Sequence, residues 1–229
     1  MIAMVFAVML QASYLDTYKK GDYKKSINEA LKVYEKTKNP EPMIFAANVS
    51  KEIGDINNYK KYLELASSGN SIDAKFKLLL EDFKENKDPE KLKSYCNNFE
   101  KYAKLGISDA AYMTGMCYYT GKGFKKNEKM ALFWFRRSDN IKDNIPAEYM
   151  LGYILYKNGD KQWKDFLTSS ALKGDKDSIV LLANILIQES DKNNFSPETV
   201  YWTKKALVES GDKNLWMMWD KYEMQRFEK

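Results

Sequence analysis

Residues 108–138 read SDAAYMTGMCYYTGKGFKKNEKMALFWFRRS. Apolar side chains recur at helical spacing on both sides of a short glycine-rich stretch, Gly121-Lys122-Gly123. Apolar residues three and four positions apart form one face of a helix, whereas clustered glycines interrupt it. The stretch therefore predicts two amphipathic helices joined by a turn, which is a helical hairpin.

Four glycines place this hairpin in an internal repeat. Gly69, Gly106, Gly174 and Gly211 each end an amphipathic stretch, and successive members are 37, 68 and 37 residues apart. Asp143 lies 37 residues after Gly106 and divides the long interval into 37 and 31. A period of this length is typical of a pair of antiparallel helices with two turns, and such pairs stack into solenoids.

This spacing divides the chain into about six hairpins. All five prolines lie at or just before the start of an apolar-periodic run, where the missing N–H costs nothing, and no low-complexity linker intervenes. We expect an all-α fold in which residues 13–229 form a single solenoid. The expected units are 9–38, 41–69, 73–106, 108–143, 146–174 and 178–211, followed by a C-terminal capping helix at 214–228.

The unit at 108–138 resembles the Sel1-like repeat, a relative of the tetratricopeptide repeat. The resemblance is strongest over residues 108–211, and residues 9–106 are similar to tetratricopeptide repeats more loosely. It implies a right-handed superhelical α/α solenoid. The last unit departs from the pattern at 191–194, which replace the turn glycines. Within residues 108–138 the matching positions are Ala110, Gly115, Tyr118, Tyr119, Gly121, Gly123, Asn127, Ala131, Trp134 and Phe135.

Most residues at the repeat positions are expected to serve packing rather than ligand binding. Small residues let two helices approach closely, and the large aromatic residues fill the space between successive hairpins. The positions assigned to the repeat framework are Gly69, Gly106, Ala110, Gly115, Tyr119, Gly121, Gly123, Ala131, Trp134, Gly152, Gly174, Trp202 and Gly211.

Composition argues against catalysis and against cofactors. The chain has no histidine, which removes the commonest general base and the commonest zinc ligand. Gly121-Lys122-Gly123 lacks the Lys-Ser/Thr ending and the preceding strand of a phosphate-binding loop. The 37 basic and 32 acidic residues are interleaved, so no basic stripe for nucleic acid emerges. We therefore expect no enzyme, no cofactor, no metal site and no nucleic-acid partner.

The two cysteines are candidates for a disulfide. Cys96 and Cys117 lie about equally far from the turn near Gly106, so they fall at the same height of an antiparallel helix pair. The alternative is that both are free thiols buried as small apolar side chains.

The first residues allow two interpretations. Residues 1–10 are an uninterrupted apolar run, and Gln11-Ala12-Ser13 follows as in a secretory signal cleaved after Ala12. The alternative is that residues 1–12 begin the N-terminal helix, although an apolar run differs from the stripe of a terminal helix. The run is too short to span a membrane. The first interpretation favours a periplasmic or secreted protein, and the second a cytoplasmic one.

Function is expected to reside on the surface of the stack. The resemblance implies a non-enzymatic scaffold that binds a partner protein along the concave face, which the first helix of each hairpin lines. The lysine- and asparagine-rich composition indicates a bacterial source. The alternative is an immunity or inhibitor protein that occludes the active site of a secreted toxin such as a lipase or cell-wall enzyme. A monomer is favoured. Aligning Gly115, Gly152 and Ala183 predicts two rows of binding residues, Met113, Met150 and Leu181, and Met116, Tyr153 and Asn184, although methionine also fills cores.

Overall fold

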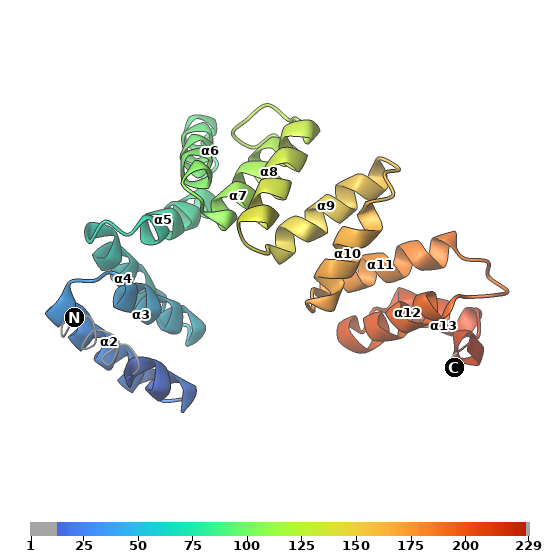
Figure 1. Cartoon of the computed structure of the whole chain (residues 1–229), viewed down its shortest axis with the longest axis horizontal. Helices are drawn as coiled ribbons and strands as arrows, with labels where there is room; N and C mark the ends of the chain where they lie inside the picture. The colour runs from blue at the N-terminus through green and yellow to red at the C-terminus, as the bar shows by residue number, and fades with distance from the viewer. Residues whose placement is uncertain (1–12, 228–229) are drawn as a thin grey trace. The chain divides into compact units, whose positions relative to one another are not determined.

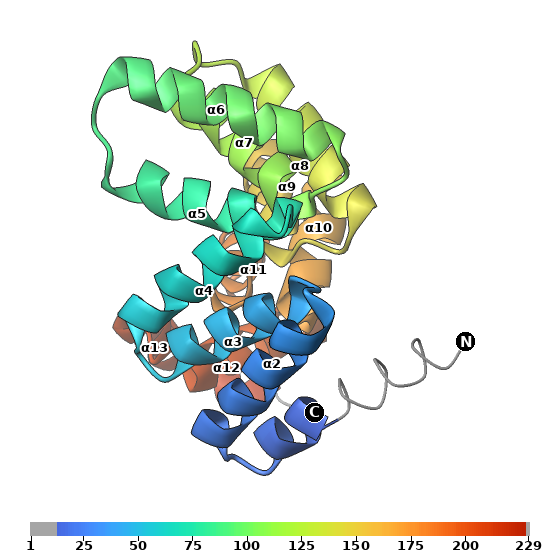
Figure 2. The same cartoon turned by 90° about the vertical axis from the view of Figure 1, so that its left-hand side faces the viewer.

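The computed structural model describes residues 13–227, all of whose regular elements are helices (Figures 1 and 2). The chain divides into two compact units, Met1–Asn98 and Phe99–Lys229. The prediction for residues 1–12 lies outside the described residues. Within residues 13–227 no helix is both long and apolar enough to cross a membrane.

Unit 1 consists of helices that pair in chain order. A helix covers residues 13–19 and packs with its successors. Figure 2 shows α2, α3 and α4 side by side. The helix α6 crosses the division between the units. The remaining bounds are α2 (Tyr23–Thr37), α3 (Glu41–Glu52), α4 (Ile56–Ser68), α5 (Ile72–Glu85) and α6 (Pro89–Lys104).

Unit 2 continues with the same alternation and ends in a short cap. Contacts among α7 to α13 run mainly between helices that are neighbours in the sequence. The bounds are α7 (Ser108–Thr120), α8 (Glu128–Ile141), α9 (Ile145–Lys157), α10 (Trp163–Leu172), α11 (Lys176–Glu189), α12 (Pro197–Ser210), α13 (Lys213–Lys221) and a 3-10 turn, η1 (Met224–Phe227).

The predicted all-α arrangement of six hairpins and a C-terminal cap is confirmed. The helix at residues 13–19 contacts α2 through Glu29, which accepts hydrogen bonds from Ser13 and Thr17. The α5 helix meets α6 where the rings of Phe83 and Tyr95 lie 6.1 Å apart. The remaining pairs are α3 with α4, α7 with α8, α9 with α10, and α11 with α12. The first member of each pair is called the first helix below, and the other the second helix.

Local sequence explains where these helices begin. Asp22, Asp55 and Asp175 each accept a hydrogen bond from a backbone N–H of the first turn, which satisfies a donor that the helix itself leaves unpaired. Pro89 and Pro197 are the first residues of α6 and α12, as expected for residues without an N–H.

Each unit has its own apolar core. In unit 1 the core includes Met43 and Leu63, both fully buried. In unit 2 one cluster centres on α9, and a larger one extends from Leu155 to Met224. Trp134 and Trp202 are 3% and 4% exposed, so both rings lie inside the stack.

The loop between α11 and α12 lacks the turn glycines of the repeat pattern, and other contacts hold it in place. A turn closes where the Asn194 N–H donates to the carbonyl oxygen of Asp191. The next residue, Phe195, is 3% exposed and packs against Tyr222 and Phe227, with ring centroids 5.7 and 5.8 Å apart. A buried aromatic anchor therefore holds a loop that lacks the turn glycines.

Candidate partner-binding face

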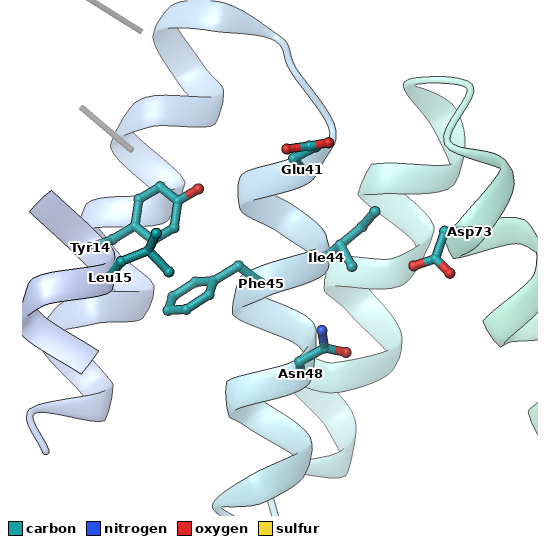
Figure 3. A pocket seen from close by; sticks show the side chains of 7 residues that line it. All are labelled: Tyr14, Leu15, Glu41, Ile44, Phe45, Asn48 and Asp73. Carbon is teal, nitrogen blue, oxygen red and sulfur yellow. The ribbon is translucent and has the colours of Figure 1, made fainter. Parts of the chain in front are cut away.

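The first helices of unit 1 form a groove of about 460 Å³ (Figure 3). Three successive first helices contribute to it, namely the helix at residues 13–19, α3 and α5. The lining residues are Tyr14, Leu15, Glu41, Ile44, Phe45, Asn48 and Asp73. We call this the unit 1 groove.

Aromatic packing holds the base of the unit 1 groove. Tyr14 is 2% exposed, and its ring lies 4.6 Å from that of Phe45, centroid to centroid. Phe45 also meets Tyr18 edge-on at 5.7 Å. Figure 3 shows Phe45 and Leu15 directed toward each other from neighbouring helices. Leu15 is 37% exposed. The unit 1 groove therefore presents an apolar side chain to solvent above an ordered aromatic base.

The rim of the unit 1 groove is polar and acidic. The Lys77 ammonium lies 3.1 Å from an Asp73 carboxylate oxygen and donates to Asn48 Oδ1 at 3.1 Å. Glu41 stands exposed in the first turn of α3, where the helix dipole favours a carboxylate, and has no ion-pair partner among the described residues. Lys77 thus neutralises the Asp73 carboxylate, whereas the Glu41 carboxylate is available for contact with a partner.

Sequence reasoning missed the unit 1 groove. Residues 9–106 match the repeat pattern only loosely, so their face-lining positions could not be aligned with those of the later units. The available signal was the helical spacing of Ile44, Phe45 and Asn48, which places them together on α3.

In unit 2 the first helices carry a cluster of tyrosines, Tyr112 and Tyr119 on α7 and Tyr149 and Tyr153 on α9. All four are partly exposed. The rings of Tyr149 and Tyr153 stack with centroids 6.3 Å apart. Burial raises the pKa of Tyr119, and the neighbouring Tyr153 raises it further, so the Tyr119 hydroxyl stays neutral at physiological pH.

Five of the six predicted binding residues are partly exposed, and one is buried. Met116 on α7 and Tyr153 on α9 are both partly exposed, and both pack against the core cluster that centres on α9. Met150 is 8% exposed and belongs to that core, so its side chain packs inside. Met113 is partly exposed on α7.

On α11, the two remaining predicted residues are partly exposed. Leu181 packs against the larger core of unit 2, and the Asn184 amide donates to the Val180 carbonyl of its own helix at 3.0 Å. Tyr112, Tyr119 and Tyr149 complete this face but were absent from the predicted rows. Their signal was present in the sequence, because Tyr112 and Tyr149 stand three positions before Gly115 and Gly152.

The arrangement is characterised by partly exposed contact surfaces on the first helices. Within residues 13–227 no three His, Cys, Asp or Glu side chains gather in a way that could hold a metal ion. Both units instead present partly exposed aromatic and apolar side chains on their first helices. Fold and face together define an all-helical repeat protein.

Comparison with known proteins finds a family match over part of the chain. Residues 108–138 and 145–164 match the family model described as Sel1 repeat. These two segments are similar to Sel1 repeats, as the resemblance predicted for this part of the chain. No curated protein matches the sequence.

Solved structures share this fold at low sequence identity. A Sel1 repeat protein from Oxalobacter formigenes is 23% identical with a TM-score of 0.67, and the match covers 89% of this chain and 86% of that one. The protein c5321, a protective antigen of uropathogenic Escherichia coli with an SLR fold, is 17% identical with a TM-score of 0.60. That match covers 91% of this chain and 47% of c5321. The RpL4 assembly chaperone Acl4 is 11% identical with a TM-score of 0.52, over 96% of each chain.

Proposed function

We propose that this protein is a non-enzymatic scaffold that binds a partner protein on its first-helix face. Repeat folds of this kind generally act as protein–protein interaction scaffolds. The observation that carries the proposal is the position of exposed aromatic and apolar side chains on first helices in both units, as the unit 1 groove and the tyrosine cluster. Aromatic side chains held by a core bind with little loss of conformational freedom.

The chemistry of the unit 1 groove suggests what the partner presents there. An apolar side chain of the partner would bury Leu15 and Ile44, and a neighbouring lysine or arginine would meet the Glu41 carboxylate. Opposite charge at the rim increases the association rate and the specificity, whereas the apolar base supplies most of the affinity.

The direct experiment is affinity capture from the native organism followed by mass spectrometry. We expect Leu15→Asp and Tyr153→Asp to weaken capture of the same partner by about tenfold or more, because each places a charge in a desolvated contact. Val208→Asp is the matched control, since Val208 is 78% exposed on the second helix α12. Circular dichroism would show that each variant folds. Full capture by both folded face variants would contradict the proposal.

The alternative role as an immunity or inhibitor protein makes a different prediction in the same experiment. An inhibitor would hold one enzyme in a stable complex and abolish its activity, whereas an adaptor would retain several partners without inhibiting them. An enzyme assay on the captured protein, with and without added scaffold, separates the two.

A further inference from the structure

A second surface lies on α8, which is a second helix and does not belong to the first-helix face. Residues at positions i, i+3, i+4, i+7 and i+8 form a stripe along α8 and line a cavity of about 450 Å³. They are Phe133, Arg136, Arg137, Asn140 and Ile141. We call this the arginine stripe.

The arginine stripe concentrates a residue that is otherwise rare in the chain. Only three of the 37 basic residues are arginines, and two of the three are the adjacent Arg136 and Arg137. Lysine supplies positive charge elsewhere. A guanidinium differs from an ammonium because its planar fork of N–H donors matches the two oxygens of a carboxylate.

Both guanidinium groups lack a counter-ion within the described residues. Arg136 donates to the neutral Gln162 amide oxygen at 3.0 Å and lies over the Phe166 ring at 5.3 Å. Arg137 lies over the Trp134 ring, 5.7 Å from its centroid. Aromatic faces orient the two cations but do not neutralise them.

Two buried donors on α8 are also unsatisfied. Arg137 Nε and Trp134 Nε1 are both buried, and neither has a hydrogen-bond acceptor. A buried N–H without an acceptor loses its hydrogen bond to water and gains none in return, so native proteins seldom contain one without a reason. An acceptor supplied from outside the chain would remove that cost at Arg137, which lines the cavity.

The flanks of the arginine stripe are apolar and open to solvent. Phe133 is 52% exposed and Ile141 is 37% exposed. A free inorganic anion would leave both side chains in water, whereas a peptide could cover them while it places an acceptor between the arginines. Asn140 adds an amide donor to the same side of α8.

We propose that Arg136 and Arg137 bind a carboxylate of a partner protein, from an aspartate, a glutamate or the C-terminus, and that an adjacent apolar side chain of the partner packs on Phe133 and Ile141. This site is independent of the proposed first-helix face, because its residues all lie on α8. It therefore gives the scaffold a second point of attachment with the opposite charge preference to the unit 1 groove.

The small number of arginines permits a direct test by nuclear magnetic resonance. The full chain, labelled with nitrogen-15, is titrated with the blocked dipeptide N-acetyl-Glu-Phe-amide up to about 10 mM, a range that detects millimolar binding. We expect the Arg137 Nε–H and Trp134 Nε1–H signals to shift. N-acetyl-Gln-Phe-amide, which has the same shape without the charge, should shift them at least about tenfold less at equal concentration.

Variants and a second anion complete the test. Arg137→Lys keeps the charge but loses the fork, so we expect about tenfold weaker binding as reported by Trp134, whereas Arg226→Gln, the matched control, should bind normally. The proposal is overturned if no signal shifts, if the glutamine peptide acts equally, or if Arg137→Lys binds like the parent. Inorganic phosphate as effective as the glutamate peptide would also overturn it, since the site would then recognise any oxyanion.

Discussion

At the scale of single residues, two glycines show why the repeat pattern requires them. A Cβ on Gly152 would lie 2.5 Å from Leu167 Cγ and 3.1 Å from the Leu167 backbone nitrogen. A Cβ on Gly115 would lie 2.6 Å from Phe135 Cε1. Both glycines sit on first helices at the closest approach of a second helix. The pattern therefore encodes the distance between paired helices rather than a flexible point.

Gly152→Ala should destabilise the protein. Alanine is favoured over glycine inside a helix by about 1 kcal/mol, but forcing a methyl group into packed atoms costs about 1–3 kcal/mol. The backbone at Leu167 cannot move aside as a side chain can, so we expect a net loss in the free energy of unfolding by urea. Ala183 is the equivalent position on α11 and already carries a Cβ. Ala183→Gly is therefore the control that makes the opposite change at the equivalent position. A Gly152→Ala protein as stable as the parent would disprove the packing argument.

A buried carboxylate joins α9 to α10. Glu148 is 4% exposed and accepts hydrogen bonds from Ser169 Oγ at 2.7 Å and from Lys173 Nζ at 2.8 Å. Its second oxygen, Oε2, has no partner. The hydrogen bond from Lys173 to Glu148 raises the pKa of that lysine, so Lys173 remains charged at neutral pH.

Lys173→Met should therefore cost more than the loss of an ordinary surface ion pair. Removing the cation leaves a buried charge without compensation, which we expect to lower the free energy of unfolding by about 2–3 kcal/mol, less than for a fully buried pair because Lys173 is 30% exposed. Adding Glu148→Leu should restore much of this loss. The exposed Lys164–Glu198 pair is the control, since breaking it should cost below about 1 kcal/mol. Equal losses at the two pairs in urea titrations would contradict this reasoning.

At the scale of elements, caps and turns specify where the helices begin and end, but different contacts hold the loops between the paired helices. The turn after α7 uses Gly121, whose φ of 78° is unfavourable for other residues. The loop after α11 instead uses the buried ring of Phe195. Local turn chemistry and a distant aromatic contact thus perform the same task at equivalent joints.

The joint between α6 and α7 leads to a prediction about the cysteines. Cys96 and Cys117 are 0% and 1% exposed, and neither is a free thiol among the described residues. We propose that they form the disulfide that their spacing predicts. Closing a loop of this size stabilises a protein by about 3 kcal/mol.

Thiol titration of the denatured, unreduced protein should accordingly detect no free thiol. After reduction, the midpoint of urea unfolding should fall, and Cys96→Ala with Cys117→Ala should behave like the reduced parent. Two free thiols in protein purified without reductant would rule out the disulfide.

At the scale of the whole molecule, stability arises from neighbouring helices. Each unit has its own core, and the contacts described within each unit run mainly between helices adjacent in sequence. In such a repeat the effects of distant substitutions should be nearly additive. The net charge of +5 does not describe the two proposed binding surfaces separately. The unit 1 groove carries the acidic Glu41 and favours a basic partner group, whereas the arginine stripe in unit 2 favours an acidic one.

The sequence by itself determined the helical hairpins, their starts and the Sel1-like class, because helical period, N-caps and steric need for glycine depend on residues close in the chain. Tertiary structure decided which side chains reach solvent. Met150 and Met116 look alike in sequence, yet neighbouring helices enclose the first and leave the second partly exposed. The unit 1 groove combines residues as distant as Tyr14 and Asp73. Exposure and unsatisfied donors depend on atoms from other helices, and that information lies in packing rather than in local pattern.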